Sequence, residues 1–402
     1  MHCQFIHMIV KKGLRMKKFK FIDLFSGIGG FHQAMTFFGG ECVLASDIDK
    51  SAIEVYKKNY NIDSNINIRD LKDDDVPDHD VLCAGFPCQA FSKAGKREGF
   101  LDQIRGTLFF EVARILKAKH PKYIMLENVR NLVSHDNGNT FKVIKETLKG
   151  LGYRLTDKPL ILSPYQFGVP QVRERVYIPG IYDPENVDKP LNIEFDRLLD
   201  KSENSVYSIL DENENSKETQ LSKHTMDVLT CWDEFYKGID IKVIGFPVWE
   251  KYFKTKEIDV DLPERKKEFI RKNQDLYKRN KKFIDSWLKK WKNLMDFTPT
   301  ERKFEWQCGK SINSVFDGII QIRPSGVRVK KPDTFQALVA LVQTPIIGKY
   351  KRRLSIREAA RLQSFPDSFI PDTNKQQAYK QLGNSVNVKV LEEIFKELIK
   401  NK

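Results

Sequence analysis

The sequence lacks the features that define membrane-spanning, secreted and zinc-binding proteins. No segment approaches the run of about 18 apolar residues that a membrane-spanning helix requires, and the N-terminus has neither the basic region nor the cleavage site of a signal peptide. Only six of the 402 residues are cysteines, and none of them forms a CxxC pair. These absences argue against a disulfide scaffold or a zinc ribbon, and they favour a reduced, cytoplasmic protein.

Positive charge, in contrast, is in excess. Lys and Arg number 68 against 54 Asp and Glu, which gives a formal net charge of +14. Half of this excess lies in residues 241–300, where 16 basic side chains face nine acidic ones. With 41% hydrophobic residues the chain has ample material for a core, so the charge points to a polyanionic partner rather than to disorder.

Up to about residue 185, short apolar runs alternate with segments of helical periodicity. This alternation is typical of an α/β protein with a doubly wound, Rossmann-like parallel sheet. In such folds, ligands bind at the carboxyl ends of the strands. The predicted strands are 20–25, 41–46, 80–84 and 123–126, and the predicted helices are 31–38, 50–59 and 108–119.

The composition changes after residue 185, which predicts a second, smaller domain. All five tryptophans lie there, and apolar residues at helical spacing predict one amphipathic helix with a basic outer face: Phe269, Leu276, Phe283, Trp287, Trp291 and Leu294. The sequence leaves open whether translation starts at Met1 or Met16. The expected organisation is a tail (1–18), a first domain (19–185), a second domain (186–345) and a C-terminal segment (346–402) that ends in a helix over 386–402.

A glycine-rich turn follows the first predicted strand, with the sequence DLFSGIGGF over residues 23–31. Its glycines allow a ligand to approach the backbone and the helix N–H groups, although the turn departs from the GxGxxG dinucleotide fingerprint. Asp47, about 20 residues further on, is placed to bind ribose hydroxyls. Asp70, at the end of a third short strand, is placed to hold an adenine amino group. Either aspartate alone is equally explained as a cap or loop residue, but the three strand ends together predict an adenosine-bearing cofactor.

The loop after the strand 80–84 carries a candidate nucleophile. Its sequence is GFPCQAFS over residues 85–92, and Pro87 stiffens the turn that presents Cys88. A free cysteine is more often a small buried hydrophobe than a nucleophile, and we interpret the other five cysteines in that way. The polar, glycine-flanked position at a strand end distinguishes Cys88 from them.

Charged side chains occupy two further positions in this half of the chain. Glu127 emerges from an apolar strand, where partial desolvation favours its neutral, proton-donating form. Gln171, Arg173 and Arg175 alternate along a predicted strand and are therefore expected to share one face. An ordinary cap or salt bridge, or an edge strand with solvated charges, explains each of these segments when it is taken alone.

Taken in order, these segments resemble the DNA (cytosine-5) methyltransferases of bacterial restriction–modification systems. The matches cover about residues 20–180 and 350–400, and the dissimilar region between them is where the family places its variable target-recognition domain. Two positions depart from the commonest pattern, since Ile48 replaces an aromatic residue and Asp47 replaces glutamate. The matching segments are 23–30 (DLFSGIGG), 85–89 (GFPCQ), 127–129 (ENV), 171–175 (QxRxR), 357–366 (REAARLQSFP) and 383–386 (GNSV).

The resemblance implies transfer of a methyl group from S-adenosyl-L-methionine, without a metal, to carbon 5 of a flipped-out cytosine in double-stranded DNA. Cys88 would form the covalent adduct, Glu127 would hold the base, and Arg173 and Arg175 would orient it. Gln89, Ser92 and Gln171 would contact DNA. The implied cofactor contacts are Phe25, Gly27, Ile28, Gly30, Asp47, Ile48, Asp70, Leu71, Pro87, Leu108, Asn384 and Ser385.

The resemblance further implies a monomer in the bacterial cytoplasm, at the nucleoid, whose modification protects DNA from a cognate restriction endonuclease. Three alternatives compete with this prediction. An RNA cytosine methyltransferase typically lacks the large insert, and an inactive DNA-binding relative would have lost Cys88 or Glu127. A nicotinamide-dependent oxidoreductase would leave the Cys88 loop and the basic insert unexplained. The DNA sequence that is recognised cannot be predicted from the chain.

Overall fold

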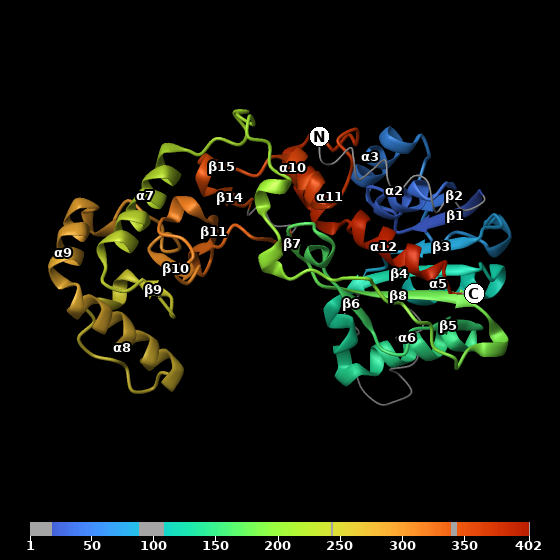
Figure 1. Ribbon diagram of the computed structural model, residues 1–402, viewed down its shortest axis with the longest axis horizontal. Helices are drawn as coiled ribbons and strands as arrows, with labels where there is room; N and C mark the ends of the chain where they lie inside the picture. Colours follow the sequence, from blue (N-terminus) through green and yellow to red (C-terminus); the bar gives the residue numbers. More distant parts are fainter. Residues whose placement is uncertain (1–17, 88–107, 243, 339–343, 402) are drawn as a thin grey trace. The chain divides into compact units, whose positions relative to one another are not determined.

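The computed structural model describes residues 18–87, 108–242, 244–338 and 344–401, which form two compact units (Figure 1). Unit 1 spans Met1–Asn204, Gln336–Ala340 and Ala359–Lys402, and unit 2 spans Ser205–Phe335 and Leu341–Glu358. Residues 186–204, which we expected in the second domain, lie in unit 1, and residues 346–358 of the expected C-terminal segment lie in unit 2. Within the described ranges, no helix is long and apolar enough to cross a membrane.

Unit 1 is built on a seven-stranded sheet with the order β2-β1-β3-β4-β8-β5, to which β6 adds by pairing with β8. The first four strands of this order are parallel, whereas β8 runs antiparallel to β4, β5 and β6. The strands are β1 (Phe19–Leu24), β2 (Gly40–Ser46), β3 (Val81–Ala84), β4 (Tyr123–Val129), β5 (Tyr153–Leu155), β6 (Leu160–Leu162) and β8 (Arg175–Tyr182).

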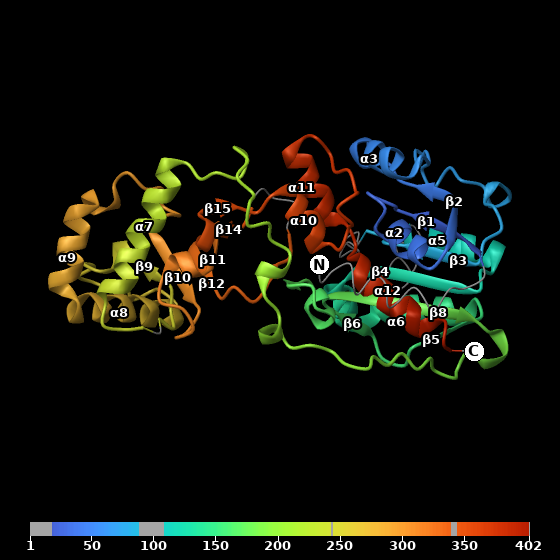
Figure 2. The same cartoon turned by 45° about the horizontal axis from the view of Figure 1, so that its top comes forward.

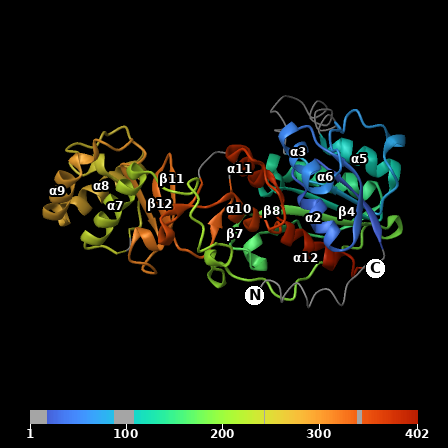
Figure 3. The ribbon, with the colours of Figure 1, turned by 90° about the horizontal axis from the view of Figure 1, so that it is seen from above.

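Helices cover both faces of this sheet (Figure 3). On one face, α5 and α6 pack against alternate strand residues such as Ile22, Leu82 and Ile124. On the other face lie α2 and α12, where Phe395 contacts Phe19 and Phe38. The bounds are α2 (Gly30–Phe37), α3 (Lys50–Tyr60), α5 (Leu108–Lys119), α6 (Asn139–Gly150), α10 (Ile356–Leu362), α11 (Lys375–Asn384) and α12 (Val388–Leu398). The predicted doubly wound α/β fold is therefore confirmed.

Unit 2 combines three helices with a six-stranded sheet of order β15-β14-β11-β12-β10-β9 (Figure 2). Aromatic residues from both layers form its core, in which Trp232 stacks on Phe304 at 4.9 Å between ring centroids. The elements are α7 (Lys223–Gly238), α8 (Glu264–Arg279), α9 (Lys281–Lys290), β9 (Val248–Trp249), β10 (Lys303–Gln307), β11 (Ile319–Arg323), β12 (Gly326–Lys330), β14 (Ile346–Ile347) and β15 (Arg352–Arg353).

Three local predictions are wrong. The single helix predicted around residues 269–294 is broken at Asn280, whose amide oxygen accepts from the Asp240 backbone N–H at 2.9 Å while its Nδ2 donates to the Asp240 carboxylate at 2.7 Å. Asp70 lies in a turn closed by its own N–H donating to the Asn67 carbonyl, not at the end of a strand. The strand predicted over 171–176 is interrupted between β7 (Gln171–Val172) and β8.

Candidate functional site

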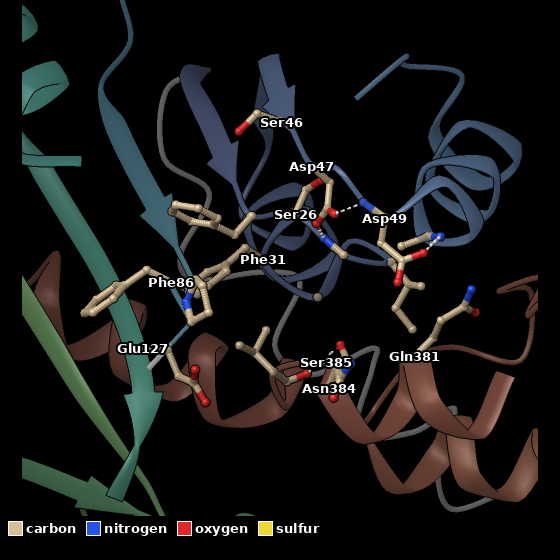
Figure 4. Close-up of a pocket in the computed structure, with 18 of the residues that line it drawn as sticks. Ser26, Phe31, Ser46, Asp47, Asp49, Phe86, Glu127, Gln381, Asn384 and Ser385 are labelled. Carbon is tan, nitrogen blue, oxygen red and sulfur yellow. Dashed lines mark hydrogen bonds between the residues drawn. The ribbon is translucent and has the colours of Figure 1, made fainter. Parts of the chain in front are cut away.

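A cavity of about 470 Å³ lies in unit 1, at the carboxyl ends of the parallel strands (Figure 4). Its walls come from the segments that follow β1, β2, β3 and β4, and from the C-terminal end of α11. Sequence segments more than 300 residues apart therefore meet around one space, at the edge where doubly wound sheets bind their ligands.

The glycine turn and Asp47 form one wall. The Gly27 N–H donates to Asp47 Oδ2 at 2.7 Å, and Asp47 Oδ1 accepts from the N–H groups of Ile48 and Asp49 at 2.7 and 2.8 Å. These three bonds fix the carboxylate at the rim of the cavity (Figure 4). Gly30 has to be glycine, because a Cβ atom there would lie 2.5 Å from Cγ2 of Val386.

The end of α11 forms the opposite wall and is tied to the start of α3. Lys380 Nζ lies 3.4 Å from Asp49 Oδ2, and Gln381 Nε2 donates to Ser51 Oγ at 3.2 Å. Asp49 in turn caps α3 by accepting from the Ser51 backbone N–H at 3.0 Å. Lys380 and Gln381 line the cavity but were missed from the sequence. Their position two and three residues before the GNSV segment was the signal that the sequence offered.

Glu127 lies at the other end of the cavity, near the C-terminal end of strand β4 (Figure 4). Its carboxylate is buried, and Arg175 Nε approaches Oε1 to 3.2 Å. Burial raises the pKa of Glu127 above the usual glutamate range, while Arg175 and Arg173 oppose this shift. The environment thus favours a carboxyl group that keeps or donates a proton next to a guanidinium.

The segment that leads to the predicted nucleophile is fixed to the same strand. Asn128 Nδ2 donates to the Phe86 carbonyl at 2.9 Å, and both residues are buried. Pro87 lines the cavity immediately before Cys88. Cys88, Gln89 and Ser92 themselves lie outside the described residues.

Arg173 lines the cavity but makes contacts that the sequence did not indicate. Its guanidinium is buried, and Nη1 and Nη2 donate to the carbonyls of Gly383 and Ser385 at 2.9 and 2.8 Å. Burial lowers the pKa of Arg173 to about 10. Because these bonds hold the residues on either side of Asn384, Arg173 positions the cavity wall that the C-terminal segment forms.

Most of the predicted cofactor contacts line the cavity, but two do not. Asp70 and Leu71 are absent from its walls, and Asn67 and Ile68 take their place. Arg114 holds this loop by donating to the carbonyls of Ile68 and Leu71 at 3.1 and 2.8 Å. The predicted contacts that do line the cavity are Phe25, Gly27, Ile28, Gly30, Asp47, Ile48, Pro87, Leu108, Asn384 and Ser385.

Gln171, predicted to contact DNA, is fully buried in unit 1. Its side-chain Oε1 accepts from Gln363 Nε2 at 3.3 Å. This placement assigns Gln171 a structural role and leaves its side chain unavailable to a DNA partner. Across the described residues, no cluster of three His, Cys, Asp or Glu side chains is arranged to hold a metal ion.

The family model for C-5 cytosine-specific DNA methylases matches residues 19–400. Three similar curated proteins are Type II methyltransferases with nearly full mutual coverage. They are M.AluI of Cellulosimicrobium cellulans (32% identity over 95% of this chain and 92% of the relative), M.BanI of Aneurinibacillus aneurinilyticus (35%, 96% and 96%) and M.HhaI of Haemophilus parahaemolyticus (32%, 96% and 96%).

Solved structures show the same fold. The S. pombe Dnmt2 methyltransferase aligns with a TM-score of 0.53 at 19% identity, covering 95% of this chain and 98% of that one. A putative DNA modification methyltransferase encoded within an E. coli prophage aligns with a TM-score of 0.55 at 19% identity, covering 95% and 99%. At this level of identity the likeness bears on the fold alone.

Proposed function

The chain belongs to the C-5 cytosine-specific DNA methylase family and is a DNA (cytosine-5-)-methyltransferase of the restriction–modification type, and from this premise we propose which residues bind the cofactor and which act on the base. The cavity of unit 1 holds S-adenosyl-L-methionine and the target base. Cys88, Glu127 and Arg175 act on the base. The observation that carries the proposal is that one cavity brings together the glycine turn, Asp47, Pro87 and Glu127.

The chemistry of the cavity walls fits an adenosyl cofactor. The Asp47 carboxylate, held by three backbone N–H groups, presents acceptors at the rim, as ribose hydroxyls require. Phe25, Ile28 and Ile68 supply apolar surface for a ring system. When bound, the cofactor supplies an electrophilic methyl group. Asn384 and Ser385 would complete its site from the C-terminal side, positioned by Arg173.

The reacting residues act on the cytosine ring. The Cys88 thiolate adds to carbon 6 of cytosine, which turns carbon 5 into the nucleophile that takes the methyl group, so that the cofactor would leave as S-adenosyl-L-homocysteine. Glu127, whose buried carboxyl favours the protonated form, donates to ring N3 and so offsets the charge that develops there. Arg175 keeps this carboxyl in place and orients the base. Loss of the proton from carbon 5 to a base then expels Cys88 as a thiolate, returns the N3 proton to Glu127 and restores the aromatic ring.

A cytosine stacked in a duplex cannot be attacked in this way, so the base has to flip out of the helix. We assign Gln89 and Ser92 to the gap that it leaves, and unit 2, with its excess of basic side chains, to recognition of the target sequence. The proposed setting is the cytoplasm, at the nucleoid, with a monomeric enzyme. A cognate endonuclease would need no physical contact with it.

The test is methyl transfer from labelled S-adenosyl-L-methionine to bacteriophage DNA by wild type and by Cys88→Ser. We expect label on carbon 5 of cytosine with wild type and none with the variant. Cys42→Ser is a matched control, because burial raises the pKa of the Cys42 thiol to about 12 and keeps it unreactive. Label on adenine, undiminished label with Cys88→Ser, or label on transfer RNA instead of DNA would contradict the proposal.

A further inference from the structure

The sheet of unit 2 differs sharply between its two faces. One face packs against the helices of unit 2. Its side chains, which are all buried in the core, are Phe304, Trp306, Val327 and Val329. Because side chains alternate along a strand, the residues between them point to the opposite face. That face is apolar near β14, where Ile319 and Ile347 are buried. Over β10, β12 and the end of β11 it is polar. The polar residues there, which we call the polar face, are Lys303, Glu305, Gln307, Gln321, Arg323, Arg328 and Lys330.

The strand register places Arg328 at the centre of this polar face. It pairs with Glu305 on β10 and with Gln321 on β11, so the three side chains form a row across the sheet. Arg328 Nε donates to Glu305 Oε2 at 2.6 Å, and Gln307 Nε2 lies 3.5 Å from the same oxygen. Glu305 therefore fixes the orientation of the guanidinium.

Part of the hydrogen-bonding capacity of this row is unused. Among the described residues, neither Nη atom of Arg328 has a hydrogen-bond partner, and Gln321 Oε1 is buried without one. The guanidinium of Arg328 is thus oriented by Glu305 and, within the described part of the chain, keeps both Nη groups free to donate to a ligand. The Arg328 side chain keeps 20% of its exposure, and Gln307 at the end of β10 is exposed.

The charge of the face indicates what that ligand is. Four cationic side chains (Lys303, Arg323, Arg328 and Lys330) share it with a single carboxylate, that of Glu305. An anionic partner is therefore favoured. β11 and β12 form an antiparallel hairpin in which Arg323 pairs with Gly326, and sheets and ribbons of this kind can present side chains to a DNA groove.

We propose that this polar face reads base edges in the major groove of DNA, with Arg328 as the central specificity-determining residue. The inference rests on the proposed function and names the surface that unit 2 uses for it. Arg328 donates through its Nη groups to O6 and N7 of a guanine, and Gln321 and Gln307 contact the neighbouring bases. Arg323 and Lys330 meet backbone phosphates. Glu305 is a positioning residue that acts through Arg328.

The experiment determines sequence preference rather than activity alone. Wild type, Arg328→Lys, Glu305→Gln and Gln321→Ala methylate a DNA library with every sequence context around cytosine, and bisulfite sequencing measures the methylation of each context. Arg279→Lys is the matched control, because Arg279 is half-exposed on α8, which packs against the apolar face. Thermal unfolding and cofactor affinity, measured on each variant, distinguish loss of fold from loss of specificity.

We expect wild type to require a guanine at one position that Arg328→Lys and Glu305→Gln no longer discriminate, with the preference there falling about 10- to 100-fold. Gln321→Ala relaxes a neighbouring position, and Arg279→Lys changes none. Unchanged context preference in folded Arg328→Lys and Gln321→Ala, in the presence of normal cytosine methylation, would overturn the inference and leave the proposed function intact. Absence of cytosine methylation by wild type would overturn both.

Discussion

The site of unit 1 and the helices of unit 2 arrange their charged side chains in opposite ways. In unit 1 the charged groups of the site are buried and locked to fixed partners, as in the Arg175–Glu127 pair, whose side chains retain 19% and 10% of their exposure. On the helices of unit 2 the ion pairs are open, as in Lys272–Glu268 with 48% and 58%. Buried charges interact strongly because water does not screen them, whereas exposed pairs contribute little. Changes in unit 1 should therefore alter chemistry, and changes in unit 2 should alter where on DNA it takes place.

The largest effect that separates the units is expected from Glu127→Gln. The amide keeps the shape of the side chain but cannot exchange a proton with the base, so turnover should fall about 100- to 10,000-fold. Single-turnover methyl transfer measures this loss. The preferred sequence context of the residual methylation should not change, because unit 2 is untouched.

Glu174→Gln is the matched control for this variant. Glu174 lies between Arg173 and Arg175 in the sequence, and it forms an exposed pair with Arg130. It should therefore leave the rate within about twofold of wild type, since exposed pairs are weak. Comparable losses in both variants would show that the region responds to any lost carboxylate and would remove the special role of Glu127.

A smaller effect is expected when the tether to the C-terminal segment is weakened. Arg173→Lys keeps the charge but cannot span the carbonyls of Gly383 and Ser385 as the guanidinium does. One lost charged hydrogen bond corresponds to about 10-fold weaker binding of S-adenosyl-L-methionine. Isothermal titration measures the affinity, and KM for the cofactor should rise more than kcat falls.

Arg173→Met extends this series, because it should weaken cofactor binding further than the lysine variant does. Arg154→Lys is the control, since Arg154 is also buried in unit 1 and binds the Lys189 carbonyl and Asp183, away from the cavity. Equal cofactor affinity in Arg173→Lys and wild type would refute the positioning role.

The extent to which the sequence predicts the fold and the site also differs between the units. In unit 1 the apolar runs and helical periods are regular, so the doubly wound class of the sheet and the glycine turn were predictable. The bonds of Arg173 were not, because they join it to residues 210 and 212 positions away. That Asn67 and Ile68 line the cavity instead of Asp70 was equally unpredictable, because it depends on how Arg114 bonds to the carbonyls of this turn.

In unit 2 the sequence was less informative for physical reasons. Helical periodicity continues across Asn280, where the chain leaves the helical conformation and the side chain bonds to Asp240, which separates α8 from α9. The sheet was not predicted at all, because its strands have two to five residues and β10 pairs in parallel with β12 instead of with β11, the next strand in sequence. The polar face could therefore be found only from the register.

The smallest expected effect tests whether the open charges of unit 2 act on DNA as a group. Lys266 and Lys282 are exposed on α8 and α9, outside the polar face of the sheet. If the duplex also contacts these helices, replacing both lysines with glutamine weakens binding to specific and non-specific DNA by the same few-fold factor. The slope of log affinity against log salt should fall by about 1 for each phosphate contact removed. Fluorescence anisotropy at several salt concentrations measures it, with Lys58→Gln and Lys117→Gln in unit 1 as the control pair. An unchanged slope would mean that the helices of unit 2 face solvent and that its DNA contacts come from the sheet alone.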